Sequence, residues 1–252
     1  MLKTRIIPTL LYRDFGLVKG IGFDSQRAIG SPLQAIKVYE MRDVDELIFL
    51  DVRASIEGRG PDFALIDDLA DECFMPFTVG GGVRTVEDVR GLLRVGADKV
   101  AINTALIERP GLIADAAEQF GSQCLVASID TRTRDDGSTT VWIYSGTVDT
   151  GRDAVDVAIH AEREGAGELL VTSADADGTQ NGYDLTTLQR VSAAVRVPVI
   201  ASGGAGNAGH LIEALHVGGA SAVAAASMFH FTEQTPREMK EALGRAGYAV
   251  RL

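Results

Sequence analysis

Short strings of hydrophobic and β-branched residues alternate along this chain with segments in which apolar residues recur every three or four positions. The short strings predict buried strands, and the longer period predicts amphipathic helices. The predicted strands are Arg5–Leu11, Glu46–Asp51, Phe77–Gly80, Lys99–Asn103, Leu125–Asp130, Glu168–Thr172, Val199–Ser202 and Ala222–Ala226. Parallel strands that alternate with helices in this number predict one closed (β/α)8 TIM barrel, a single domain over residues 1–252.

Turn and helix signals add detail to this pattern. Pro110 and Pro236 are expected in the first turns of helices, where proline loses no hydrogen bond. The segment Thr131–Gly146 is the one departure from the alternation, because Thr, Val, Trp and Tyr alternate around Asp136-Gly137. An Asp-Gly pair in this setting predicts a β-hairpin. The hairpin would follow the fifth strand, at the end of the barrel that carries active sites.

The second half of the chain repeats the first. Three segments recur at matching places: residues 45–51 at 167–173, residues 76–82 at 198–204 and, after one inserted glycine, residues 96–104 at 219–227. The first two pairs share an offset of 122 residues. The repeat predicts two half-barrels, so that any site on one half has a twin on the other.

Composition excludes several classes of function. The net charge of −11 argues against general affinity for nucleic acid or anionic lipid. Cys73, Cys124 and the four histidines lack metal-ligand or nucleophile spacing, and no dinucleotide or P-loop motif occurs, so neither a metal nor a cofactor is expected. The apolar runs have only strand length, and the first residues do not resemble a signal peptide. A cytoplasmic protein without membrane contact is expected.

Two glycine motifs predict phosphate sites. Gly80-Gly-Gly82 and Gly203-Gly204 each follow a strand and precede a helix. Phosphate binds bare backbone N–H groups and helix N-termini, and glycine permits close approach, although a turn alone also needs glycine. The strands that follow end in Asn103-Thr104 and Ala226-Ser227. The twin positions predict a substrate with a phosphate at each end, lying across the barrel mouth.

Carboxylates at strand ends are the candidates for acid–base chemistry. Asp130 closes the fifth strand and Asp51 the second, which places both at the active end. Asp175 and Asp177 are expected to contact the ligand, although any of these aspartates can instead cap a turn. Lys19, in a long loop predicted after the first strand, is either a counter-charge for phosphate or an ordinary surface lysine.

Charged residues also stand at strand starts, which meet at the opposite end of the barrel: Arg5, Glu46, Lys99 and Glu168. Glu46 and Glu168 are related by the repeat. Two interpretations are open for this set. It forms either a stabilising layer of salt bridges or a gate through the bottom of the barrel.

Several motifs resemble those of a known family: Arg5-Ile-Ile-Pro, Phe77-Thr-Val-Gly-Gly-Gly, Ala97-Asp-Lys-Val-Ala-Ile-Asn-Thr, Gly121-Ser-Gln, Asp177-Gly-Thr, Gly182-Tyr-Asp and Ile200-Ala-Ser-Gly-Gly-Ala-Gly. The sequence is similar along its length to the cyclase subunit of imidazole glycerol phosphate synthase. In that family a glutaminase subunit docks on the bottom of the barrel, and ammonia passes through the barrel to a bis-phosphate substrate.

The resemblance implies roles for residues of this chain. The charged set becomes the entrance of an ammonia tunnel, and Asp98 matches the docking residue that faces the glutaminase in a heterodimer. The residues implied in phosphate binding are Gly82, Asn103, Thr104, Asp177, Gly178, Gly204 and Ser227.

One position departs from the family. Its catalytic pair is an aspartate at the end of the first strand and a second one at the end of the fifth. The second is Asp130, but Leu11 occupies the first position. The internal repeat locates the same gap, because it pairs Leu11 with Asp130. Leucine can neither donate nor accept a proton, and Asp14 lies three residues further into the predicted loop.

Leu10-Leu11 and four further segments more closely resemble a paralogue: Gly16-Leu-Val-Lys-Gly, Val44-Asp-Glu-Leu-Ile-Phe-Leu-Asp, Glu72-Cys-Phe-Met-Pro and Gly218-Gly-Ala-Ser-Ala-Val-Ala-Ala. Such paralogues act with a glutaminase and a sugar amidotransferase to form acetamidino sugars of cell-surface polysaccharides. The resemblance therefore favours an ammonia conduit with weakened cyclase activity. The alternatives are the genuine cyclase of histidine biosynthesis and a related phosphosugar isomerase, which needs no charged gate. A binding module without catalysis would not need twin phosphate sites.

Overall fold

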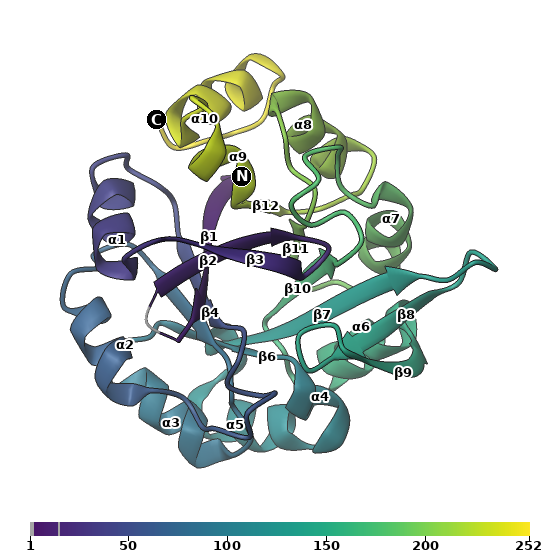
Figure 1. Ribbon diagram of the computed structural model, residues 1–252. Helices are drawn as coiled ribbons and strands as arrows, with labels where there is room; N and C mark the ends of the chain where they lie inside the picture. Colours follow the sequence, from purple (N-terminus) through teal and green to yellow (C-terminus); the bar gives the residue numbers. More distant parts are fainter. Residues whose placement is uncertain (1–2, 15) are drawn as a thin grey trace.

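Eight parallel strands close into a barrel in this computed structural model, which describes residues 3–14 and 16–252. The strands are β1 (Arg5–Arg13), β4 (Leu47–Asp51), β5 (Phe77–Gly80), β6 (Lys99–Ile102), β7 (Leu125–Thr133), β10 (Glu168–Ser173), β11 (Val199–Ser202) and β12 (Ala222–Ala225). They pair in chain order, β12 with β1 and β7 with β10, so no edge is left open. The predicted (β/α)8 barrel is confirmed (Figure 1).

Helices surround the barrel: α1 (Pro32–Glu40), α2 (Phe63–Ala70), α3 (Val86–Arg94), α5 (Leu112–Phe120), α6 (Ala154–Glu164), α7 (Leu185–Ala194), α8 (Ala208–His216) and α10 (Pro236–Arg245). Two short helices, α4 (Thr104–Glu108) and α9 (Ser227–Phe231), follow β6 and β12. Pro236 begins α10 behind a capping box made by Thr235, as expected. Pro110 instead precedes Gly111, the N-cap of α5, and lies outside the helix.

Two layers of apolar side chains hold the barrel. Odd and even strand positions face opposite sides, so one set packs under the helices and the other fills the barrel interior. The interior set consists of Ile7, Ile48, Ala101, Val126, Leu170, Ile200, Ala222 and Ala224, all buried. None of the helices that the structure describes has both the length and the apolar surface to span a bilayer.

Strands outside the barrel form two insertions. The predicted hairpin after β7 is present as β8 (Thr139–Ile143), and a further strand, β9 (Val148–Asp153), pairs with it. The expected long loop after β1 is instead an antiparallel hairpin of β2 (Gly16–Ile21) and β3 (Asp24–Gly30). The interpretation of Thr131–Gly146 as the one departure was therefore wrong. Each half-barrel carries extra strands after its first barrel strand.

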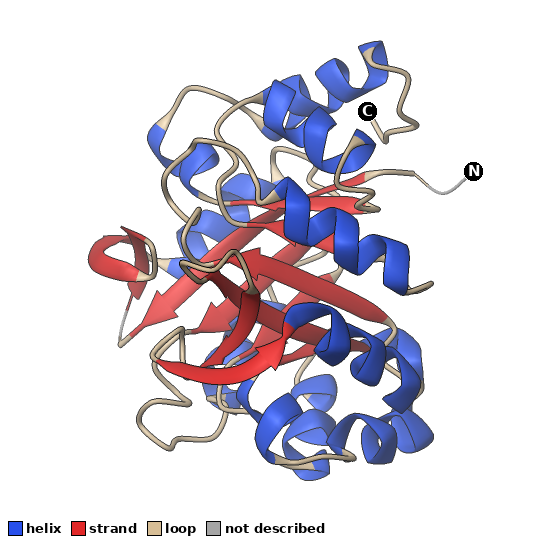
Figure 2. Cartoon of the chain, turned by 90° about the vertical axis from the view of Figure 1, so that its right-hand side faces the viewer, coloured by secondary structure: helices blue, strands red, loops and turns tan. Residues whose placement is uncertain are grey.

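The β2–β3 hairpin lies over the carboxyl ends of the strands. Figure 1 shows it crossing the centre of the barrel, and Figure 2 shows it at the left, standing off one end of the sheet. Because β1 continues through Arg13, Asp14 follows the strand directly instead of lying inside a loop. Glu46 directly precedes β4 and Asn103 directly follows β6, so each lies one residue outside the observed strand, although the predicted strand included it.

Candidate active site at the barrel mouth

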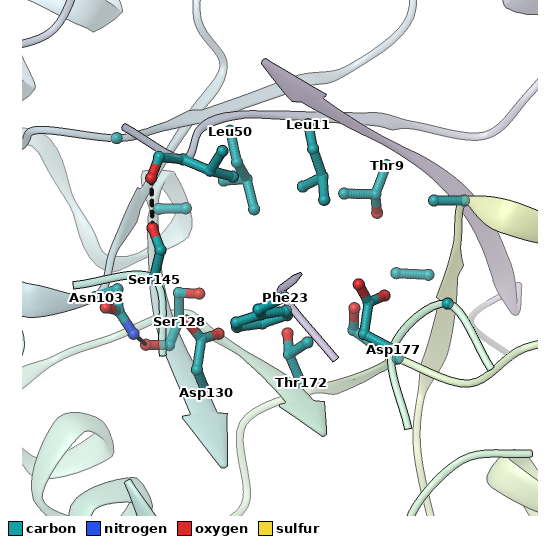
Figure 3. Close-up of a pocket in the computed structure, with 18 of the residues that line it drawn as sticks. Thr9, Leu11, Phe23, Leu50, Asn103, Ser128, Asp130, Ser145, Thr172 and Asp177 are labelled. Carbon is teal, nitrogen blue, oxygen red and sulfur yellow. Dashed lines mark hydrogen bonds between the residues drawn. The ribbon is translucent and has the colours of Figure 1, made fainter. Parts of the chain in front are cut away.

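A cavity opens at the carboxyl ends of the barrel strands, beneath the β2–β3 hairpin. It holds about 1170 Å³, including the part open to solvent, which is enough for a small-molecule substrate. Figure 3 shows Leu11 and Leu50 on one side of it, opposite Asp130 and Asp177. Most of the predicted site residues line this cavity: Leu11, Lys19, Gly82, Asn103, Thr104, Asp130, Asp177, Gly178, Gly204 and Ser227.

The phosphate site predicted for the first half lies at β5 and β6. Thr104 begins α4, and its hydroxyl donates to the Oδ1 atom of Asn103 at 3.3 Å. The Asn103 amide in turn donates to the Ser128 carbonyl at 3.0 Å, which fixes its orientation. The Thr104 hydroxyl also accepts from the Tyr144 N–H group at 3.2 Å, so the turn after β8 reaches this site from the other half-barrel.

The twin site lies at β10, β11 and β12. Ser227 begins α9, and its hydroxyl oxygen is buried without a hydrogen-bond partner among the described residues. Lys19 is 2% exposed, and its ammonium lies 3.8 Å from the Asp177 carboxylate. Burial lowers the pKa of Lys19, and Asp177 opposes that effect. Lys19 therefore lies in β2, a strand of the hairpin itself, as a buried cation at the twin site, and not on the surface.

The glycine motifs have a packing role of their own. Gly82 and Gly204 both have left-handed backbone conformations, with φ of 73° and 103°. A Cβ atom on Gly82 would lie 2.6 Å from the Arg59 carbonyl oxygen, and one on Gly204 would lie 2.0 Å from the Gly182 carbonyl oxygen. Both positions require glycine before any ligand binds. In each half the glycine packs against a backbone carbonyl of the loop after the preceding strand, so the likeness of the two halves extends into the loops.

Asp130 is the carboxylate that faces the apolar side of the cavity. Burial, together with the nearby Asp177 carboxylate, raises the pKa of Asp130 to about 7, while Arg132 opposes the shift. Leu11, its partner in the repeat, lies across the cavity beside Leu50 (Figure 3). The mouth thus has an apolar surface where the resemblance calls for a second catalytic carboxylate.

Asp51, Asp175 and Asp14 do not line the cavity. One carboxylate oxygen of Asp51 accepts from the backbone N–H groups of Arg53 and Ala54, at 2.9 and 3.0 Å, and the other contacts the Arg59 guanidinium at 3.2 Å. These contacts cap the loop after β4. The structure therefore gives Asp51 a turn-capping role, while its predicted catalytic role has no support from its position.

The four charged residues at the strand starts form a closed ring. Arg5 contacts Glu46 at 2.6 Å and Glu168 at 2.7 Å. Lys99 contacts the same two carboxylates, at 3.0 and 2.9 Å. Burial alone would raise the pKa of Glu168, but Arg5 and Lys99 outweigh it and lower that pKa. The ring closes the barrel bottom beneath the interior apolar layer, a geometry that suits both predicted interpretations.

Asp98 lies exposed on the same end of the barrel as the ring. Its carboxylate accepts from the Phe77 N–H group at 2.8 Å, and its own N–H group donates to the Phe77 carbonyl at 2.9 Å. Asp98 therefore caps the start of β5, a structural contact that its predicted docking role did not anticipate.

Sequence reasoning missed several cavity residues. Thr9 is 7% exposed and lines the cavity with a hydroxyl that has no partner among the described residues. Ser145 and Phe23 reach the cavity from the turns of the two insertions. Thr9 could have been predicted to line the cavity, because it lies two residues before Leu11 and therefore on the same face of the strand. The positions of the turn residues depend on the hairpins, which the sequence specifies weakly.

No group of three His, Cys, Asp or Glu side chains within residues 3–14 and 16–252 is arranged so that it could hold a metal ion. Charge at the mouth is instead carried by single groups. Asp130 and Asp177 are the carboxylates, and Lys19 the ammonium group, of the described residues that line the cavity.

Comparison with known proteins gives consistent matches over nearly the whole chain. The model of the family described as histidine biosynthesis protein matches residues 5–235. The imidazole glycerol phosphate synthase subunit HisF of Caulobacter vibrioides, from strain NA1000 / CB15N and from strain ATCC 19089 / CIP 103742 / CB 15, is similar to this chain. Each of these relatives is 54% identical over 253 residues, which cover 100% of this chain and 97% of the relative.

Proposed function

Because this chain belongs to the histidine biosynthesis protein family, we propose that it is the ammonia-accepting synthase subunit of an imidazole glycerol phosphate synthase. This is the function that the sequence offered as the alternative to the acetamidino-sugar paralogue. The observation that carries it is the cavity itself. Its twin glycine loops follow β5 and β11, on opposite sides of the barrel, and Asp130 lies on β7 between them.

The substrate in this proposal is a small molecule with a phosphate at each end. One phosphate would bind at Gly82 and Thr104, and the other at Gly204 and Ser227. The unpartnered Ser227 hydroxyl supports the second assignment, because a buried hydroxyl without a partner is costly unless a ligand completes it. Lys19 supplies positive charge beside that site in a chain that is acidic overall.

Asp130 would move protons in the reaction. A carboxyl group with a pKa of about 7 is present in both protonation states at neutral pH, so it can accept a proton in one step and return it in another. Leu11 leaves Asp130 without the partner that the family pairs with it. Asp177 also lines the cavity, but it is ion-paired with Lys19. Turnover is therefore expected to be slow compared with a relative that has aspartate at the Leu11 position.

Ammonia in this proposal enters from the opposite end of the barrel, from a glutaminase subunit docked over Asp98. The charged ring is closed in the isolated chain, so it would have to open for each ammonia molecule to pass. Its members are Arg5, Glu46, Lys99 and Glu168. Beyond the ring the path is apolar up to Thr9, which suits a small neutral molecule and excludes ions.

The acetamidino-sugar paralogue is the second candidate. The comparisons do not support the preference for it that the sequence motifs suggested, because both relatives are named as synthase subunits. Leu11 is the observation that favours it, since a barrel that only passes ammonia to a sugar amidotransferase needs no acid–base pair. The two functions differ in turnover of the bis-phosphate substrate, which only the first requires.

Phosphate titration followed by backbone amide NMR tests the substrate class. We expect the amides of residues 81–83 and 203–205 to shift together with those of Thr104 and Ser227 at millimolar inorganic phosphate. The amide of Gly137, in the exposed turn after β7, is the internal control. No response of either loop at tens of millimolar phosphate would contradict the proposed synthase function, which needs a phosphorylated substrate.

A further inference from the structure

Arg132 occupies an unusual position at the cavity mouth. It lies two residues after Asp130 on β7, so its side chain points to the same side of the strand. Its guanidinium stands over the ring of Trp142, 5.2 Å from the ring centroid, and is 24% exposed. One of its terminal nitrogens donates to the Asp175 carboxylate at 2.9 Å. The other donates to the Gly22 carbonyl oxygen at 3.0 Å.

Gly22 is in the turn of the β2–β3 hairpin, so Arg132 ties that hairpin to the barrel. A second hydrogen bond also joins the turn to the barrel: the Gly22 N–H group donates to the Asp177 carbonyl at 2.9 Å. Gly178 lies directly against the hairpin backbone, because a Cβ atom there would be 2.1 Å from the Gly20 carbonyl oxygen. The hairpin turn therefore rests on the loop that lines the second phosphate site.

The platform for Arg132 is built from the other insertion. Trp142 is on β8 and pairs with Asp130 in the β7–β8 ladder, so it shares the Arg132 side of that ladder. Asp175 is held in place because it also accepts from the Thr133 N–H group at 2.9 Å. The Arg132 side chain thus joins three separate segments, namely the β2–β3 turn, β8 and the loop after β10.

From these contacts we infer that Arg132 is a positioning residue that latches the β2–β3 hairpin over the Asp177–Gly178 side of the cavity. Stacking on Trp142 fixes the plane of the guanidinium, and the Asp175 carboxylate holds one edge of it. The other edge is then aimed at the Gly22 carbonyl. Closing the latch buries Lys19 beside Asp177. Opening it would expose the second phosphate site to solvent and admit the ligand. The functional meaning of the latch rests on the proposed function, but its existence does not.

Hydrogen exchange of the Gly22 amide, measured on the full chain without ligand, tests the latch. We expect Arg132→Ala to speed exchange at residues 20–23 by about tenfold or more, because a charged hydrogen bond and a cation–π contact are lost. Exchange in β4 and β11 should stay unchanged. Arg134→Ala is the matched control, since Arg134 lies on the same segment but pairs with Asp149 and does not touch the hairpin.

Arg132→Lys provides a second variant that preserves the charge. Lysine cannot bond both partners in a plane while stacked on Trp142, so exchange at Gly22 should lie between the wild-type and alanine values. Unchanged exchange at residues 20–23 in both variants would overturn the latch, and so would equal acceleration across the whole barrel in both. Exchange at Gly22 should also slow when inorganic phosphate is added to the wild-type protein. If added phosphate does not slow exchange but the Arg132 variants behave as expected, the result would contradict the proposed ligand and not the latch.

Discussion

Leu11 and Asp130 face each other across the cavity mouth, and together they determine the acid–base chemistry available there. The sequence predicted that the two residues occupy equivalent positions, because the internal repeat aligns the end of the predicted first strand with that of the fifth. It did not predict that Asp51 would turn out of the cavity. The backbone N–H groups of Arg53 and Ala54 hold that carboxylate, and such a local cap has no signature beyond an aspartate at a strand end.

The raised pKa of Asp130 predicts a particular pH dependence of stability. In the folded protein this carboxyl keeps its proton up to about pH 7, whereas an ordinary aspartate loses it near 3.8. The unfolded chain therefore releases the proton first, and the contribution of Asp130 to stability falls as pH rises from about 4 to about 7. The slope is at most ~1.4 kcal/mol per pH unit.

Asp130→Asn removes this titration. Urea unfolding at pH 5 and pH 7 should show that the variant gains stability relative to the wild-type protein as the pH is raised. Equal changes in the free energy of unfolding for both proteins over that interval would show that the pKa of Asp130 is ordinary.

Secondary-structure elements were predictable where the hydrophobic pattern was strong. All eight barrel strands end within three residues of their predicted ends, and Phe77–Gly80 and Val199–Ser202 match the prediction at both ends. The β2–β3 hairpin was missed because the sequence of β3, Asp24-Ser-Gln-Arg-Ala-Ile-Gly, is largely polar, so it lacks the alternation that identifies a half-buried strand. β8 was found because Asp136-Gly137 marks its turn.

A buried ion pair fixes the last helix to the barrel. Lys240 on α10 is 3% exposed, contacts the Asp45 carboxylate at 2.9 Å and donates to the Asp43 carbonyl. Lys240→Met would leave the Asp45 carboxylate without its cation, so we expect a loss of about 3–5 kcal/mol in the free energy of unfolding.

The exposed pair of Lys37 and Glu72 is the matched control for this change, because it joins α1 to the turn after α2 at the surface. Lys37→Met should cost no more than about 1 kcal/mol. Urea denaturation measures both variants. A similar small loss for Lys240→Met would mean that the buried pair contributes little to holding α10.

At the scale of the whole molecule, two half-barrels place matching loops on opposite sides of one mouth, and a charged ring closes the other end. The repeat made this layout predictable from the sequence. The contacts of single residues were less predictable, because one residue can serve both packing and function. Asp98 is the clearest case, since it was expected at a partner interface and also caps β5 through the Phe77 N–H group.

Variants of Asp98 separate these two roles. Asp98→Asn keeps an oxygen that can accept from the Phe77 N–H group but removes the charge, whereas Asp98→Lys reverses the charge and loses the cap. We expect a glutaminase subunit to be retained weakly by the first variant and least by the second in a pull-down, with both proteins folded. Full retention of the glutaminase by Asp98→Lys would place the interface elsewhere.

Turnover of the histidine-pathway bis-phosphate intermediate with free ammonium tests the proposed function most directly, because it requires both phosphate sites and Asp130. The wild-type protein should bind the intermediate but turn it over at least ~10³-fold more slowly than a relative with aspartate at the Leu11 position. Asp130→Asn should abolish the remaining rate, and Leu11→Asp should recover part of the difference. Absence of binding, or a rate that does not depend on Asp130, would contradict the assignment of this cavity as a synthase site.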